Sequence, residues 1–248
     1  MSRAVAPQPP PPSAIVHNTK DMTKASQTLS RAIETAPVLS TPAASKVPPG
    51  YVVPYKGGYG SALEVQSDGI TFALKVCDAD DVNKKESYER EANALKRTDN
   101  CYIVKLHGAF QERSHLCLVL DLANKSLENV LAQTKRLTPD DAKHYARGIA
   151  AGLSYLHSLE IVHRDIKPSN VLLFGEDSRQ VKLADFGLAL WLGGKRKAIQ
   201  GACGTDDYQA PEMTGHIPYN TQVDVYSFGV TAYRMVTGNL FKGGLARM

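Results

Sequence analysis

Apolar and polar residues recur along the middle of the chain with periods that predict its elements. After Thr138, apolar residues return at spacings of three and four, which predicts a long helix that buries one face. Thr138 suits the N-cap and Pro139 the first helical position, and the helix is expected to end near Ser158. The apolar stripe consists of Ala142, Tyr145, Ile149, Leu153 and Leu156. We interpret this helix as part of the core.

Short apolar runs separated by turn residues predict a β-sheet earlier in the chain. The Asp-Gly pair at residues 68–69 is a hairpin signal, and a strand is expected to follow it over residues 70–76. Two further strands are expected over residues 103–110 and 116–122. A helix over residues 82–96 separates them from the first strand.

The first 49 residues differ in composition from the rest. They hold nine of the fourteen prolines and are rich in Ala, Ser and Thr. This is too little apolar material to offset the entropy of ordering, so residues 1–49 are predicted to be a disordered tail and residues 50–248 the folded part. The segment 7–12 favours polyproline II and has a PxxP spacing, so its role is either that of a solvated linker or that of a ligand for an SH3-type partner. Residues 21–35 could form a weak amphipathic helix.

Composition narrows the classes of protein further. The 248 residues are 43% hydrophobic, no apolar run approaches the roughly 20 residues that cross a bilayer, and no secretory leader is visible. The four cysteines form no CxxC pair, which is typical of a reducing compartment. The tail carries three of the four net positive charges, so no basic stripe for nucleic acid is expected. We expect a cytoplasmic protein without a membrane partner, with a nuclear location, or an organellar one reached through an acid-poor transit peptide, as the alternatives.

Candidate chemistry appears in the loop that precedes the apolar run 171–173. A carboxylate at Asp165 could accept the proton of a substrate hydroxyl, and Lys167 could neutralise a phosphoryl group. Asn170 could give its side-chain oxygen to Mg²⁺. The alternative is a Pro-containing surface turn in which these are turn residues. A second acid, Asp185, ends an apolar strand before Phe-Gly, where a divalent cation could be held.

Two motifs carry a family resemblance. With His-Arg-Asp at residues 163–165 and Asp-Phe-Gly at residues 185–187, the chain resembles a eukaryotic protein kinase. The resemblance implies a two-lobed α+β fold: a small antiparallel β-sheet lobe with one helix and the hinge over residues 50–123, and a mainly helical large lobe over residues 124–248. It also implies ATP and Mg²⁺ as cofactors and a protein Ser or Thr side chain as substrate.

Site residues carry over from the family position by position. The implied catalytic residues are Asp165 and Lys167, and the implied metal ligands are Asn170 and Asp185. The implied ATP-binding residues are Gly57, Gly58, Gly60, Lys75, Glu91, Asp121 and Ala123. Of these, Lys75 would be held by Glu91, while Asp121 and Ala123 would act through main chain alone. Glu128 could reach the ribose or remain solvated.

Several positions depart from the family pattern. Tyr55 stands at the first glycine of the glycine-rich turn and Ala62 at the valine that follows it, so nucleotide affinity is expected to be reduced. Residues 188–204 contain no Ser, Thr or Tyr, so activity is expected to be independent of phosphorylation in this loop. The large lobe is expected to be incomplete, with an exposed apolar face around Val230, Met235 and Val236.

Three functional hypotheses remain, one of which, an interaction protein acting through its proline-rich tail, rests on residues 7–12 alone. The first is a Ser/Thr kinase. The sequence of residues 224–230 favours the tyrosine-kinase-like group of these kinases. In this reading Thr205 bonds the catalytic groups, and a buried Asp224 holds the catalytic loop. The alternative is a catalytically impaired, kinase-like module that binds nucleotide or a partner.

Overall fold

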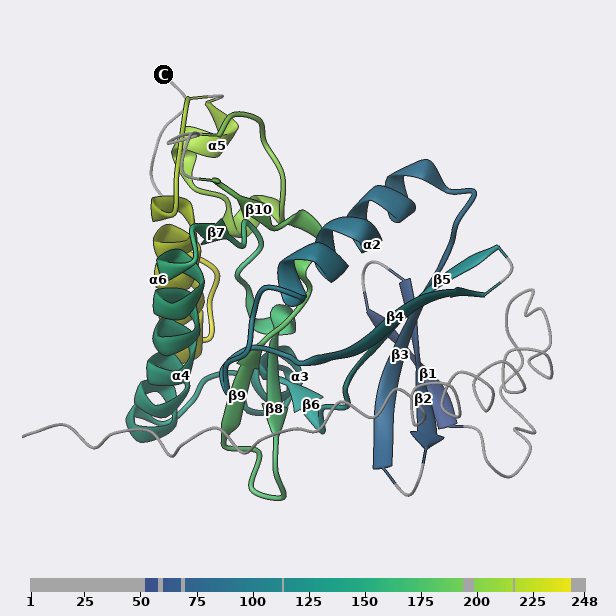
Figure 1. Ribbon diagram of the computed structural model, residues 1–248. Helices are drawn as coiled ribbons and strands as arrows, with labels where there is room; N and C mark the ends of the chain where they lie inside the picture. Colours follow the sequence, from purple (N-terminus) through teal and green to yellow (C-terminus); the bar gives the residue numbers. More distant parts are fainter. Residues whose placement is uncertain are drawn as a thin grey trace, which may run out of the picture. The chain divides into compact units, whose positions relative to one another are not determined.

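The computed structural model describes residues 52–57, 60–67, 70–112, 114–193, 199–215 and 217–241. The predicted disordered tail, its polyproline segment and its weak helix lie outside these residues, as does Gly58. Within the described residues the protein has the expected α+β architecture, with an antiparallel sheet and one helix in one lobe and mainly helices in the other (Figure 1).

The small lobe is built on one five-stranded sheet. Its strands are β1 (Val52–Gly57), β2 (Gly60–Ser67), β3 (Ile70–Asp78), β4 (Leu106–Glu112) and β5 (His115–Asp121). They are ordered β1-β2-β3-β5-β4, and every pairing is antiparallel. The expected hairpin between β2 and β3 is present, and β3 lies in the middle of the sheet. A side chain on β3 is therefore held by neighbours on both sides.

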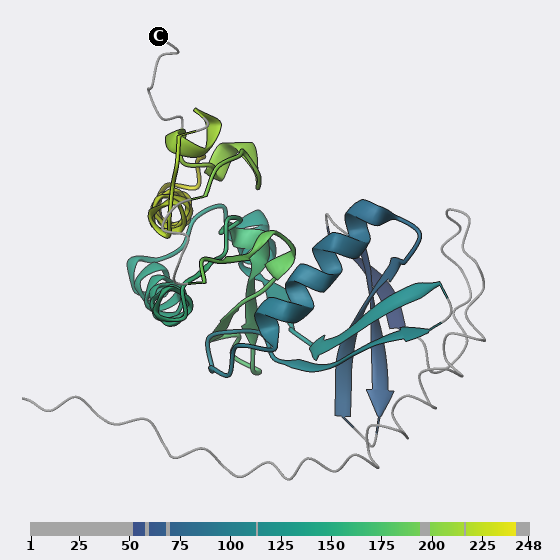
Figure 2. The ribbon, with the colours of Figure 1, turned by 45° about the horizontal axis from the view of Figure 1, so that its top comes forward.

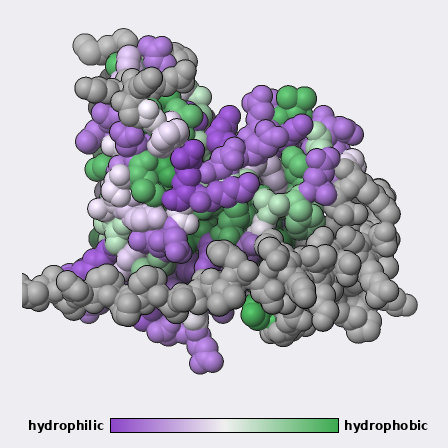
Figure 3. All heavy atoms as spheres, in the orientation of Figure 1, coloured by the Kyte–Doolittle hydropathy of each residue, from purple (hydrophilic) through white to green (hydrophobic). Residues whose placement is uncertain are grey.

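Helix α2 (Val82–Leu95) follows β3, as the sequence predicts. Asp81 caps its N-terminus by accepting a hydrogen bond from the Lys84 N–H. Tyr88 and Leu95 are buried, whereas much of the outward surface of α2 is hydrophilic in the view of Figure 3. The helix thus has one face available for contacts inside the domain.

The large lobe contains four helices and two small sheets among the described residues. The helices are α3 (Leu127–Thr134), α4 (Pro139–Ser158), α5 (Pro211–Thr214) and α6 (Gln222–Thr237). One sheet has β6 (Lys125–Ser126), β8 (Val171–Phe174) and β9 (Gln180–Leu183), and the other has β7 (Ile161–Val162) and β10 (Leu190–Trp191). Helices α4 and α6 lie side by side (Figure 2).

Helix α4 has the bounds and the apolar stripe that the sequence predicts. Ile149 and Leu156 are fully buried in the main core. Gly152 allows the helix to lie close to β9, since a Cβ there would come within 2.9 Å of the Leu183 side chain. The helix therefore supports the strand that leads to Asp185.

The predicted strand over residues 103–110 is wrong at its start, because β4 begins only at Leu106. Ile103 instead forms a parallel bridge with Leu183 of β9, and the Val104 N–H donates to the Leu183 carbonyl at 2.9 Å. These residues join the segment before β4 to the large lobe. Such a long-range pairing cannot be recognised from apolar periodicity alone.

The predicted exposed apolar face on α6 is wrong for two of its three residues. Val230 is 4% and Met235 1% exposed, and Met235 belongs to the main core, while Val236 is 56% exposed. Met235 shares the main core with residues of α4, against which α6 packs. None of the helices in the described part of the chain has the length and apolarity needed to span a membrane.

Candidate active site

Lys75 of β3 links α2 to the segment after β9. Its Nζ donates to Glu91 Oε2 at 2.7 Å and to Asp185 Oδ1 at 3.0 Å. Burial alone would lower the pKa of Lys75, but the two carboxylates raise it above its ordinary value, so the ammonium stays charged at neutral pH. Burial would raise the pKa of Asp185, but Lys75 lowers it and keeps that carboxylate ionised. The structure therefore brings together three residues that lie far apart in the sequence.

Asp165 lies in the loop between β7 and β8 and receives hydrogen bonds on both carboxylate oxygens. Lys167 Nζ donates to Oδ2 at 2.8 Å, and Thr205 Oγ1 donates to Oδ1 at 2.8 Å. Lys167 also donates to Thr205 Oγ1 at 2.6 Å. A carboxylate, an ammonium group and a hydroxyl thus form a closed triangle. Such a group can accept a proton beside a fixed positive charge.

Asn170 completes this loop from the short helix 168–170. Its Nδ2 donates to the Asp165 carbonyl at 2.8 Å and to Asp165 Oδ2 at 3.0 Å. This orientation turns the amide oxygen of Asn170 away from Asp165, so the oxygen is available for another ligand. The side chain is therefore positioned by Asp165.

Asn170 and Asp185 are the residues here that could hold a metal ion. Both offer hard oxygen atoms, and Mg²⁺ commonly takes one or two protein oxygens and completes its shell with phosphate and water. The described residues contain no group of three or more His, Cys, Asp or Glu side chains suited to a metal. A two-ligand Mg²⁺ site that is completed by a bound nucleotide fits this donor set.

Asp224 of α6 holds the backbone of the loop that carries Asp165. It is fully buried, and its carboxylate accepts the His163 N–H at 2.9 Å and the Arg164 N–H at 2.8 Å. His157 Nε2 also lies 2.8 Å from Asp224 Oδ2. Arg164 has a φ of 68°, an uncommon conformation for a residue with a side chain, and these bonds hold it there.

The Asp-Phe-Gly segment packs directly on the catalytic loop. Phe186 is fully buried, with its ring centroid 4.8 Å from that of His163, and His163 Nε2 lies 3.0 Å from the Ala184 carbonyl oxygen. Asp185 itself has a φ of 64°. The two motifs recognised in the sequence therefore form one packed unit.

Comparison with known proteins identifies the same family that the sequence motifs resemble. A family model described as the protein kinase domain matches residues 56–244. The chain belongs to the protein kinase domain family. This kinase domain is 34% identical over 189 residues to the inactive serine/threonine-protein kinase PLK5 of Mus musculus, 36% over 199 residues to rhodopsin kinase grk7a of Danio rerio, and 34% over 197 residues to ribosomal protein S6 kinase alpha-1 of Homo sapiens.

These alignments cover 74%, 76% and 76% of the chain, but only 31%, 35% and 26% of the respective relatives. The chain therefore spans about a third or less of the length of these proteins. Membership in the family shows the domain and its homology to Ser/Thr kinases.

The glycine-rich turn of the kinase domain joins β1 to β2. Gly57 ends β1 and Gly60 begins β2, and the two are paired in the ladder. In the next ladder Ala62 lies opposite Lys75. The turn therefore leads into β2, the strand next to the one that carries Lys75. Glycine in such a turn lets backbone N–H groups approach phosphate oxygens.

The kinase hinge begins where β5 ends. Asp121 is the last residue of β5, and its N–H donates to the Lys105 carbonyl at 3.2 Å. Ala123 lies two residues on, immediately before Asn124, whose N–H donates to the Leu173 carbonyl at 3.0 Å. The main chain of Ala123 is thus held between the two lobes.

The side chain of Asp121 has contacts that the sequence analysis missed. Its carboxylate lies 2.7 Å from His107 Nε2 and 2.5 Å from Lys182 Nζ, and it accepts the Lys105 N–H at 3.1 Å. Burial alone would raise the pKa of Asp121, but His107, Lys182 and Lys105 lower it to about 2. The one available signal was Lys182, a cation within the otherwise apolar run 181–184.

Glu128 of α3 is paired with α6, although its side chain is 37% exposed. Its carboxylate forms a bidentate ion pair with Arg234 of α6, with N–O distances of 2.6 and 2.7 Å. Arg234 also donates to the Tyr208 hydroxyl at 2.7 Å. The sequence analysis missed this ion pair, because Arg234 lies 106 residues later in the chain.

Proposed function

We propose that this domain is an ATP-dependent protein serine/threonine kinase, which transfers the γ-phosphoryl group of ATP to a Ser or Thr hydroxyl. Fold alone does not justify this, because one fold can carry several functions. The proposal rests on the arrangement around Asp165. Its two oxygens are bonded by Lys167 and Thr205, and Asn170 and the Lys75–Asp185 pair complete the set of groups that phosphoryl transfer requires.

In this proposal Asp165 orients the substrate hydroxyl and accepts its proton as the oxygen attacks phosphorus. Such general-base assistance is typically worth about 10²–10⁴-fold in rate. Lys167 donates to Asp165 Oδ2, so its charge lies beside the attacking oxygen and can stabilise negative charge on the transferring group. Thr205 fixes the carboxylate through the other oxygen.

The nucleotide would be held by residues from both lobes. Mg²⁺, when bound with ATP, neutralises charge on the phosphate oxygens. The oxygens of Asn170 and Asp185 would hold this ion. Lys75 would contact the α- and β-phosphates, and its ion pair with Glu91 keeps the ammonium group in place. The turn between Gly57 and Gly60 would cover the phosphates with its backbone N–H groups.

Specificity for Ser and Thr is supported by Lys167 and Thr205, the residue types that Ser/Thr kinases carry at these positions. We also propose that the domain belongs to the tyrosine-kinase-like group, because of the sequence of residues 224–230. Neither assignment identifies the substrate protein.

A second candidate is a kinase-like module that binds nucleotide without turnover. Tyr55 and Ala62 depart from the usual glycine-rich sequence, and one similar protein is named an inactive kinase. This candidate requires the Lys75 ion pair and the hinge, but it does not require Asp165 to act as a proton acceptor.

Thermal shift with Mg-ATP, combined with radiolabelled phosphate transfer to a generic Ser/Thr substrate, separates the two. A thermal shift with transfer, where transfer disappears in Asp165→Ala while the shift remains, supports the kinase. A shift without transfer in the unaltered protein supports the binding module. If the protein shows no thermal shift and no phosphate transfer, both candidate functions are overturned.

A further inference from the structure

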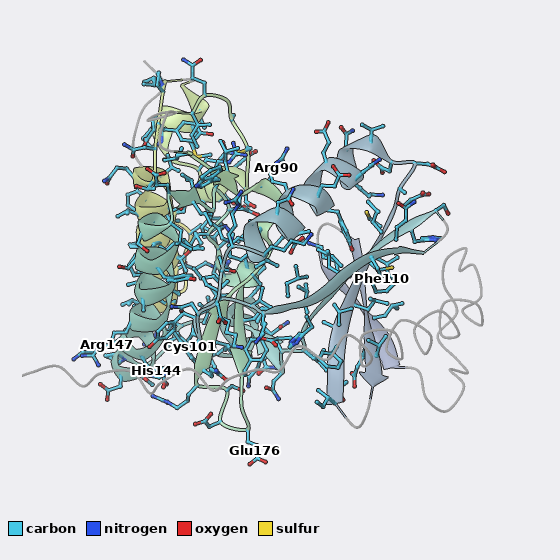
Figure 4. The ribbon with its side chains drawn as sticks, in the orientation of Figure 1. Arg90, Cys101, Phe110, His144, Arg147 and Glu176 are labelled. Atoms are coloured by element: carbon cyan, nitrogen blue, oxygen red, sulfur yellow. The ribbon has the colours of Figure 1, made fainter. Side chains whose placement is uncertain are left out.

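We propose that Arg90 is a positioning residue for the metal site: it fixes the Asp-Phe-Gly segment to α2 and so sets the location of the Asp185 carboxylate. The inference rests on the proposed nucleotide site and adds to it a residue that no catalytic motif marks. Arg90 Nη1 donates to the Gly187 carbonyl at 2.9 Å. Figure 4 labels Arg90 on α2.

The contact belongs to a continuous stripe on α2. Ser87, Arg90 and Glu91 are spaced by three and four residues, so they share one face of the helix. Ser87 Oγ lies so close to Gly187 that an added Cβ would come within 2.3 Å of it. Glu91 reaches Asp185 through Lys75. This face of α2 therefore touches the segment at both Asp185 and Gly187.

A second arginine holds the next carbonyl from the opposite side. Arg164 of the catalytic loop donates from Nε to the Leu188 carbonyl at 2.7 Å. Two guanidinium groups, one from each lobe, thus bond consecutive carbonyls just after Asp185. Hydrogen bonds from a charged donor are stronger and better oriented than neutral ones. The backbone leaving the metal ligand is consequently fixed at two successive peptides.

This arrangement needs no phosphate. Residues 188–204 offer no hydroxyl side chain, and Arg164 instead bonds main chain. The position of α2, which carries Arg90 and Glu91, then determines whether Asp185 is in place. Loss of Arg90 should release one anchor of the segment while leaving Lys75, the hinge and the glycine-rich turn intact. The effect is expected on metal-assisted binding rather than on nucleotide binding as such.

The test is calorimetric titration of ATP with Mg²⁺ and of ATP with EDTA, which does not depend on turnover. In the unaltered protein Mg²⁺ should strengthen ATP binding. In Arg90→Ala this Mg²⁺-dependent gain should fall by about tenfold, the effect of losing roughly one charge-assisted hydrogen bond, while affinity in EDTA stays the same. Arg90→Lys, which keeps a charged donor, should recover part of the gain. Lys85→Ala, which removes an exposed cation from the same helix, is the matched control and should change neither value.

The outcomes are separable. If Arg90→Ala keeps the full Mg²⁺-dependent gain, or loses affinity equally with and without Mg²⁺, Arg90 is not a positioning residue for the metal site. If the unaltered protein transfers no phosphate but the Arg90→Ala effect on Mg²⁺-dependent binding is present, the proposed catalysis fails and the role of Arg90 stands. If ATP binds with no Mg²⁺-dependent gain even in the unaltered protein, the inference is overturned.

Discussion

The hydroxyl of Thr205 donates a 2.8 Å hydrogen bond to Oδ1 of Asp165, across 40 residues of sequence. The same hydroxyl accepts a bond from Lys167 at 2.6 Å. Thr205 therefore connects the segment after β10 to the proposed base, and its contact orders the carboxylate without any modification of that segment. The position of Asp165 depends on a side chain that itself performs no chemistry.

Replacing Thr205 by Val keeps its shape but removes both hydrogen bonds. We expect kcat for phosphate transfer to fall by about tenfold, since both hydrogen bonds to charged groups are lost while Lys167 still bonds Asp165 directly, with little change in KM for ATP. Thr205→Ser, which retains the hydroxyl, is the control and should keep most of the rate. Steady-state kinetics on both variants would check this, and a Val variant as fast as the Ser variant would contradict it.

Removing the Lys75 ammonium leaves Glu91 buried without its cation. In Lys75→Met, unfolding free energy at neutral pH should fall by about 3 kcal/mol, because a buried charge that loses its partner is costly. The double variant Lys75→Met/Glu91→Gln should recover much of this loss, although nucleotide binding stays impaired. Urea denaturation of the single and double variants tests the coupling. Equal stability of the two would show that Glu91 is not a buried anion.

Gly187 faces Ser87 so closely that side-chain volume should decide the position of the metal loop. In Gly187→Ala the new Cβ would lie 2.3 Å from Ser87 Oγ, so the segment or the Ser87 side chain must shift, and we expect Mg-ATP affinity to fall several-fold through a shift of the segment. Adding Ser87→Ala removes the clashing oxygen and leaves Ser87 Cβ at 3.7 Å, an ordinary contact. The double variant should therefore bind Mg-ATP better than Gly187→Ala alone. Calorimetric titration measures this, and the absence of any recovery would argue against the contact.

The parts of the fold that the sequence predicts well are those governed by local periodicity. The stripe from Ala142 to Leu156 gives α4 its bounds, and the Asp-Gly pair after β2 gives the first hairpin. The start of β4 was missed because Ile103 pairs with Leu183, a neighbour 80 residues away that no local pattern reveals. Met235 was expected at the surface, but the partner that buries it, α4, is identified only by tertiary packing.

The same distinction between local sequence signals and long-range packing applies to the site. Asp165, Asn170 and Asp185 could be proposed because their motifs are short, ordered and chemically specific. Arg90 and Arg234 could not, because an arginine on a helix surface is ordinarily solvated and its partner is distant in sequence. Their contacts, with Gly187 and Glu128, are set by how the lobes and helices pack.

The last prediction concerns the Asp121 carboxylate and its dependence on pH. Its pKa in the folded protein is about 2, below its ordinary value of 3.8, so ionised Asp121 stabilises the fold. This stabilisation is fully present above about pH 4 and is lost as pH falls towards 2. Because the side chain is partly exposed, we expect Asp121→Asn to cost only about 1–2 kcal/mol at pH 7.

Urea denaturation at pH 7, 5, 4 and 3 tests this prediction. The gap between unaltered protein and Asp121→Asn should be present at pH 7 and 5 and should narrow below pH 4, as the carboxylate becomes protonated and resembles the amide in charge. Asp80→Asn, an exposed acid on the loop before α2, is the control and should show a much smaller gap. ATP affinity of Asp121→Asn should be unchanged, since in the proposed function the hinge would bind adenine through main chain. A gap that is absent at pH 7, or that fails to narrow below pH 4, would mean that His107 and Lys182 do not stabilise the ionised form of Asp121.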